Sequence, residues 1–130
     1  MAHIATLCVA ATLACAPYAT HAQNSEPSRQ HAACMAKAHS VTSDMIECIT
    51  AEFQRQDARL NKAYQAAMGD LQPPRKKQLQ EAQRAWIKFR DANCGFYADP
   101  DGGSLARVSG NDCMLNATAA RARELESFRQ

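Results

Sequence analysis

The side chains best suited to metal chemistry lie close together in the first third of the chain. His31, Cys34, Met35 and His39 recur at helical spacing, and imidazole with sulfur is a ligand set that suits copper or zinc. Such a site needs a free thiolate, whereas Cys34 is one of four cysteines that we expect to form disulfides. We therefore predict no metal and no cofactor, and a periplasmic metal carrier is the least favoured function.

Side chains for covalent or acid–base catalysis do not form a recognisable set. No arrangement of Ser, His and Asp is evident, and a catalytic cysteine would have to stay out of the disulfides. Asp57 lies at the edge of an apolar helix face, but no second acid or histidine converges with it on the same helices. The sequence therefore predicts a protein that is not an enzyme.

Two charged residues interrupt predicted apolar faces and need partners. Asp57 lies at the edge of one face and Arg121 lies near the middle of another, and burying either charge alone would cost several kcal/mol. We expect Asp57 to pair with Arg121 or with Arg90. Asn61 and Tyr64 would complete the hydrogen-bonded network. We interpret these five residues as structural.

The N-terminal segment has the composition of a secretory signal peptide. Residues 1–22 contain no Asp, Glu, Lys or Arg, are apolar over 4–16, and end on a small-x-small triplet. The apolar run is shorter than the roughly 20 residues that a transmembrane helix needs. We expect cleavage after residue 22, a periplasmic or secreted product, and no membrane attachment afterwards. A polar, disordered leader over 23–30 would precede one domain over 31–130.

Four cysteines remain after the signal peptide is removed, and an even set in an exported chain predicts two disulfides. They are Cys34, Cys48, Cys94 and Cys113. Four cysteines allow three pairings, and sequence alone does not choose among them. We favour the local pairing, Cys34 with Cys48 and Cys94 with Cys113, because it follows the predicted helices. Each bond would contribute on the order of 3 kcal/mol in the loop-entropy model.

The spacing of apolar residues predicts an all-α fold. One long amphipathic helix is expected over 43–70, and a second over 74–96 that packs antiparallel to it. The inner face of the second helix is predicted to carry Leu79, Ala82, Trp86, Phe89 and Phe96. A last helix would begin at Asn111 or Asp112. With a short apolar segment over 31–38, these elements predict a small antiparallel helical bundle with two disulfides.

The stretch between the last two predicted helices is the best candidate for a contact surface. Residues 98–110 are rich in glycine and turn-forming residues, and a bond between the flanking cysteines would lower the entropy of holding them for a partner. The charged residues of this stretch are Asp99, Asp101 and Arg107. An ordinary solvated connection explains the composition equally well.

Three stretches of the chain, taken in order, are similar to a known family. They are Asp57-x-x-Leu60-Asn61-x-x-Tyr64, then Gln83-x-x-Trp86-x-x-Phe89-Arg90-Asp91-x-x-Cys94, then Cys113 with Thr118, Arg121 and Glu124-Leu125. The chain from about Cys34 to Leu125 thereby resembles the LprI-like lysozyme-inhibitor N-terminal domain, a bacterial periplasmic or lipoprotein family. The resemblance implies a secreted helical domain, and at least one namesake member inhibits lysozyme.

Taken together, these features predict a secreted protein-binding module with lysozyme as the candidate target. The net charge of +2 is spread without a basic block, which excludes an ordinary nucleic-acid-binding surface. Lysozymes are usually cationic, so a favourable field would have to come from local acids such as Asp99, Asp101 and Asp112. The alternative is an immunity or envelope-stress protein that binds another partner.

Overall fold

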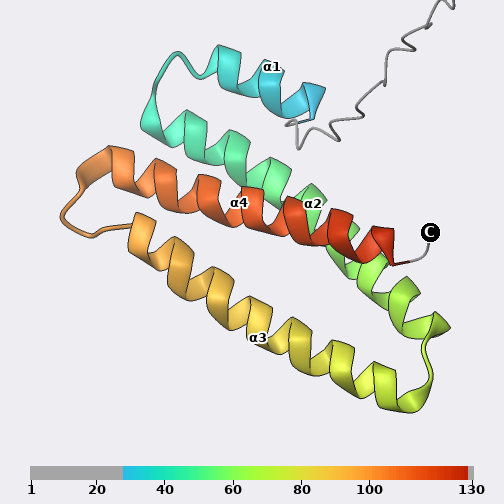
Figure 1. Ribbon diagram of the computed structural model, residues 1–130. Helices are drawn as coiled ribbons and strands as arrows, with labels where there is room; N and C mark the ends of the chain where they lie inside the picture. Colours follow the sequence, from blue (N-terminus) through green and yellow to red (C-terminus); the bar gives the residue numbers. More distant parts are fainter. Residues whose placement is uncertain (1–27, 129–130) are drawn as a thin grey trace, which may run out of the picture.

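The structure, a computed structural model, describes residues 28–128, which form four helices (Figure 1). They are α1 (Arg29–Lys37), α2 (Thr42–Asp70), α3 (Pro73–Tyr97) and α4 (Gly103–Ser127). The predicted all-α class is confirmed. The predicted signal peptide and most of the predicted leader lie outside the described residues. Among the described helices, none combines the length and apolarity that crossing a membrane requires.

The helices lie side by side in the order α1, α2, α4, α3 (Figure 1). α4 packs most extensively on α2 and also contacts α3, whereas α2 and α3 have almost no direct contact. α2 and α4 run in the same direction, and α3 runs antiparallel to both (Figure 1). The expected pairing of α3 with α2 was therefore wrong, because the C-terminal helix lies between them.

The core lies where α2 meets α4. Its buried residues recur at helical spacing on both helices, with one contribution from α3. They are Leu60, Ala63, Ala67, Leu79, Ala122 and Leu125. Three of the six are alanines, and such small side chains let two helix backbones approach closely. Tyr64 and Trp86 pack against this cluster from its edge.

Both predicted disulfides are present, and the local pairing is confirmed. Cys34–Cys48 joins α1 to α2 with 5.7 Å between the Cα atoms, and Cys94–Cys113 joins α3 to α4 with 5.4 Å. Each bond therefore fastens a helix that has little buried apolar surface to one that has more.

The connection between α3 and α4 is shorter than predicted. α4 begins at Gly103 rather than at Asn111 or Asp112, so the connection spans only residues 98–102. Gly110, which the sequence suggested as the end of the loop, lies inside the helix against Ala98. A Cβ atom on Gly110 would lie 2.5 Å from the Cβ of Ala98. The glycine therefore serves the close approach of α4 to the end of α3.

A buried carboxylate holds α1 on α2. Glu52 is 1% exposed and accepts a hydrogen bond from the Ser28 hydroxyl (2.6 Å), which itself caps α1 by accepting from the His31 N–H (3.1 Å). Arg55 and Gln56 donate to the same carboxylate. Burial alone would raise the pKa of Glu52, but these hydrogen bonds and the charge of Arg55 outweigh it and lower the pKa from 4.5 to about 2.

We predict that acid pH destabilises the fold through Glu52. A pKa lowered on folding means that the ionised carboxylate stabilises the protein above pH 4.5, and that this contribution is lost as the pH falls toward about 2. The loss should be on the order of 3 kcal/mol. In urea unfolding, Glu52→Gln should be clearly less stable than wild type at about pH 7. The difference in free energy of unfolding should shrink as the pH approaches about 2. A pH-independent gap would contradict this role.

Gly110→Ala should destabilise the protein by about 1–3 kcal/mol, because the added methyl group overlaps Ala98. Gly95→Ala in α3 is the matched control, since nothing lies within 4 Å of a Cβ atom there. That change should stabilise by about 0.5–1 kcal/mol, the ordinary effect of replacing glycine within a helix. Opposite signs in urea unfolding are the expected result, and equal effects would refute the close approach.

Candidate protein-binding surface

Exposed apolar side chains gather where α3 turns into α4. Phe96 is 79% exposed, Tyr97 is 50% exposed, and Leu105, in the first turn of α4, is 74% exposed. The rings of Phe96 and Tyr97 meet edge to face, with 5.7 Å between their centroids. We name these three residues, together with Asp99 and Asp101, the corner surface. Exposed apolar patches on a protein surface often mark an interaction site.

The corner surface is held by covalent and hydrogen bonds. The Cys94–Cys113 disulfide lies within one turn of Phe96, and the Asn93 amide approaches the sulfur of Cys113 at 3.6 Å. Within the connection, Asp99 Oδ1 accepts from the Asp101 N–H at 2.9 Å, and its carbonyl accepts from the Gly102 N–H at 3.1 Å. The backbone is therefore ordered before any partner arrives, which reduces the entropy lost on binding.

The charge of the molecule is unevenly distributed around this corner. Asp99 and Asp101 are exposed, and within residues 28–128 neither forms an ion pair. Arg107, the third charged residue predicted for the loop, lies instead on α4, so the connection itself is purely acidic. By contrast, α3 carries six basic residues against two acidic ones. A cationic partner is therefore favoured at the corner and disfavoured along α3.

The predicted polar network is divided into two parts. Asp57 accepts a hydrogen bond from the Asn61 amide at 3.0 Å on α2, so these two predicted partners do meet. Neither Arg90 nor Arg121 pairs with Asp57, which corrects the prediction. Tyr64 lies half-buried against the core cluster. The reason is the position of α4, which takes Arg121 to the α3 side of the molecule.

Arg90 and Arg121 form a separate cluster around Trp86. Their guanidinium carbons lie 5.0 Å and 5.8 Å from the centroid of the indole ring, within cation–π range. Arg121 is 7% exposed, donates through Nε to Gln83 (2.9 Å), and forms an ion pair with Glu124 (2.8 Å). Arg90 bonds Asp91 and reaches Thr118 at 3.4 Å. Arginine and glutamine thus occupy part of the contact between α3 and α4.

This polar content explains why the inner face of α3 was only partly predicted, with Leu79 and Trp86 placed correctly. The face that packs on α4 carries Leu79, Gln83, Trp86, Arg90 and Cys94. Phe89 and Phe96 were expected there and instead are 64% and 79% exposed. Gln and Arg on the buried face interrupt the apolar repeat that the prediction depended on. The neighbouring face, which carries the exposed phenylalanines, has the more regular apolar spacing.

The side chains considered as metal ligands do not converge. Cys34 is in a disulfide, His39 is exposed in the turn after α1, and His31 is buried with neither ring nitrogen hydrogen-bonded to another described residue. Within the part of the chain that the structure describes, no group of three or more His, Cys, Asp or Glu side chains is arranged to hold a metal ion.

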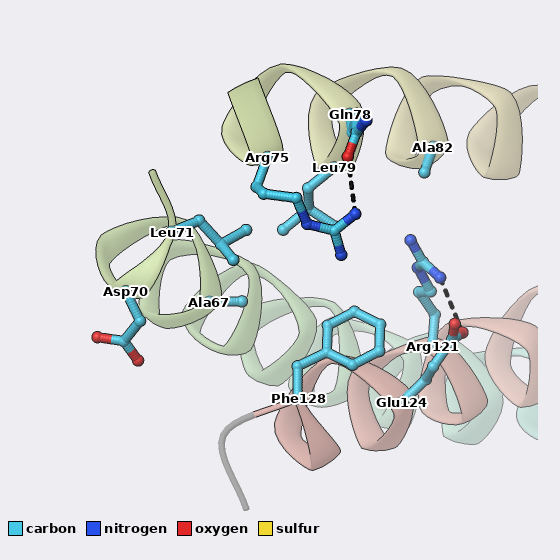
Figure 2. A pocket seen from close by; sticks show the side chains of 10 residues that line it. All are labelled: Ala67, Asp70, Leu71, Arg75, Gln78, Leu79, Ala82, Arg121, Glu124 and Phe128. Carbon is cyan, nitrogen blue, oxygen red and sulfur yellow. Dashed lines mark hydrogen bonds and ion pairs between the residues drawn. The ribbon is translucent and has the colours of Figure 1, made fainter. Parts of the chain in front are cut away.

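A crevice of about 430 Å³, which the sequence did not reveal, lies at the other end of α3 (Figure 2). It opens between the end of α2, the start of α3 and the end of α4. Its lining residues are Ala67, Asp70, Leu71, Arg75, Gln78, Leu79, Ala82, Arg121, Glu124 and Phe128. The crevice exists because α2 and α3 diverge from their short connection while α4 ends before reaching it.

Comparison with known families settles the relationship of the chain. The family described as Lysozyme inhibitor LprI matches residues 34–125. This chain belongs to the LprI family. The matched LprI region contains both disulfides, the corner surface and the cluster around Trp86.

The chain is also similar to an uncharacterized protein of Rhizobium meliloti (strain 1021). The two are 31% identical over 101 residues, which cover 65% of this chain and 71% of the relative. No solved structure matches the chain.

Removing the Cys94–Cys113 bond should lower the free energy of unfolding by about 3 kcal/mol and loosen the corner surface. The control is the pair Cys34→Ser and Cys48→Ser, which should cost a similar amount but leave the corner ordered. Limited proteolysis would then cut within residues 98–102 only in the variant with Cys94→Ser and Cys113→Ser. Equal cleavage of both variants would show that the bond does not hold the corner.

Proposed function

We propose that this LprI-family protein is an exported, non-catalytic module that inhibits lysozyme by placing its corner surface over the substrate cleft. The observation that carries the proposal is the corner itself: exposed Phe96, Tyr97 and Leu105 beside two acids that form no ion pair within residues 28–128, on a disulfide-braced backbone. The family match supplies the target class. The two disulfides favour an oxidising compartment such as the periplasm or the exterior.

The composition of the corner matches what drives protein association. Aromatic and large aliphatic side chains supply most of the binding free energy of typical interfaces when a partner buries them. Phe96 and Leu105 present the largest exposed apolar surfaces here. Since the backbone beneath them is already ordered, less entropy is lost on binding than with a free loop.

The acids of the corner give the complex its orientation. A cationic lysozyme is attracted to Asp99 and Asp101 and repelled by the basic residues along α3. The overall charge of +2 is therefore compatible with binding a cationic protein through this end. Inhibition by this route is steric and needs no catalytic group on the inhibitor.

A turbidity assay of bacterial cell-wall lysis tests the proposal directly. The mature protein in excess should slow lysis by lysozyme, and the effect should weaken as ionic strength rises. Reversing the corner charges with Asp99→Lys and Asp101→Lys should weaken inhibition by about tenfold or more. The control, Glu47→Lys with Glu81→Lys, makes the same change in net charge at exposed acids away from the corner and should retain inhibition.

Three outcomes would count against the proposal. Undiminished lysozyme activity at low salt with the wild-type protein in excess would remove lysozyme as the target. Equal losses in the corner and control variants would remove the corner as the binding surface. Inhibition that is indifferent to salt would contradict the electrostatic orientation.

A further inference from the structure

The crevice at the opposite end of α3 has an apolar interior. Ala67 and Leu79 belong to the buried core, and Leu71 and Ala82 continue the apolar wall toward the opening. The ring of Phe128 projects into the space from the end of α4 (Figure 2). A space of this size and lining suits the apolar part of a small molecule.

Two guanidinium groups face this crevice from opposite walls. Figure 2 shows Arg75 extending over the space from the start of α3, and Arg121 reaching toward α3 from α4, while the carboxylate of Asp70 points away. Arg75 donates to Gln78 at 2.7 Å, and among residues 28–128 Glu124, paired with Arg121, is the one acid whose carboxylate faces the crevice. With Asp70 turned away, the balance of the described side chains that face the space is therefore one positive charge.

Arg121 is built into the protein as a fixed donor. Its burial and its bonds to Gln83 and Glu124 hold the guanidinium in place, using Nε and Nη1. Nη2 has no hydrogen bond to another residue within 28–128. A buried guanidinium with a spare donor is a strong site for a carboxylate, since the two form short, charge-assisted hydrogen bonds.

We propose that this crevice binds a single-chain amphiphile with one carboxylate, such as a medium-chain fatty acid. The chain lies against Leu79 and Phe128, and the carboxylate lies between Arg75 and Arg121. The apolar lining selects the chain, and the single excess positive charge selects a monoanion over a neutral or cationic head.

This site is separate from the corner surface. The crevice lies at the start of α3 and the corner at its end, roughly 35 Å apart along a helix of 25 residues (Figure 1). Binding of an amphiphile therefore leaves the corner accessible, and the inference does not depend on the proposed lysozyme inhibition.

The fluorescence of Trp86 provides a readout for ligand binding in the crevice. It is the only tryptophan of the chain, and the Arg121 guanidinium lies over its ring at 5.8 Å. Titration of the full-length mature protein with decanoate, below its micelle concentration, should change the fluorescence of Trp86 in a saturable manner. Decanol and decyltrimethylammonium, which share the chain but not the carboxylate, should bind about tenfold more weakly or worse. Isothermal titration calorimetry provides a second readout that does not depend on Trp86.

Three variants separate the crevice from the general surface of α3. Ala82→Phe fills the crevice and should abolish decanoate binding, and Arg75→Gln should weaken it by about fivefold or more. Lys77→Gln, a neighbouring exposed residue that does not line the crevice, should leave it unchanged. Circular dichroism confirms that each variant is folded, and each should still inhibit lysozyme as wild type does.

The proposal is overturned by any of three results. The first is that decanoate binds no more tightly than decanol. The second is that its signal arises only at micelle-forming concentrations, and the third is that Lys77→Gln weakens binding as much as Arg75→Gln. If the wild-type protein inhibits lysozyme but does not bind decanoate, the crevice proposal has failed. If it binds decanoate but does not inhibit lysozyme, the proposed function has failed.

Discussion

The contact between α2 and α4 is the interaction on which the rest of the structure depends. Ala63, Ala67 and Ala122 keep this contact close, and Leu60 and Leu125 fill it. Because α4 occupies the apolar face of α2, α3 can pack only on the far side of α4. The same arrangement separates α3 from α2 and thereby opens the crevice. α1 and the α3–α4 corner have little apolar burial of their own, and each is fastened by a disulfide.

Polar residues inside the fold explain what the sequence could and could not predict. The helical class followed from apolar spacing, the local disulfide pairing was favoured by it without being decided, and the family followed from residues such as Trp86 and Arg121. The partner of α3 was missed because Gln83 and Arg121 occupy its contact with α4. The start of α4 was missed because Gly110 resembles a turn residue, whereas it is a packing residue beneath Ala98. The crevice forms because α2 and α3 diverge in space, and no local sequence pattern predicts that divergence.

The two ends of α3 have opposite chemical character, and this division suggests how one small domain can hold two sites. The corner is acidic, apolar and covalently braced, which suits a protein partner. The crevice is lined by Leu79 and Phe128 with arginines at its walls, which suits a small anionic amphiphile. The basic residues of α3 lie between them and oppose docking of a cationic protein along that helix.

A map of the lysozyme contact on the protein itself tests the corner surface most directly. Backbone amide NMR spectra of the labelled domain, recorded with and without unlabelled lysozyme, would report the contact residue by residue. We expect the perturbed amides to concentrate at residues 96–105, with α1 and the α2–α3 connection unchanged. Perturbations centred on the basic face of α3 or on α2, or none at saturating lysozyme, would contradict the corner surface as the inhibitory site.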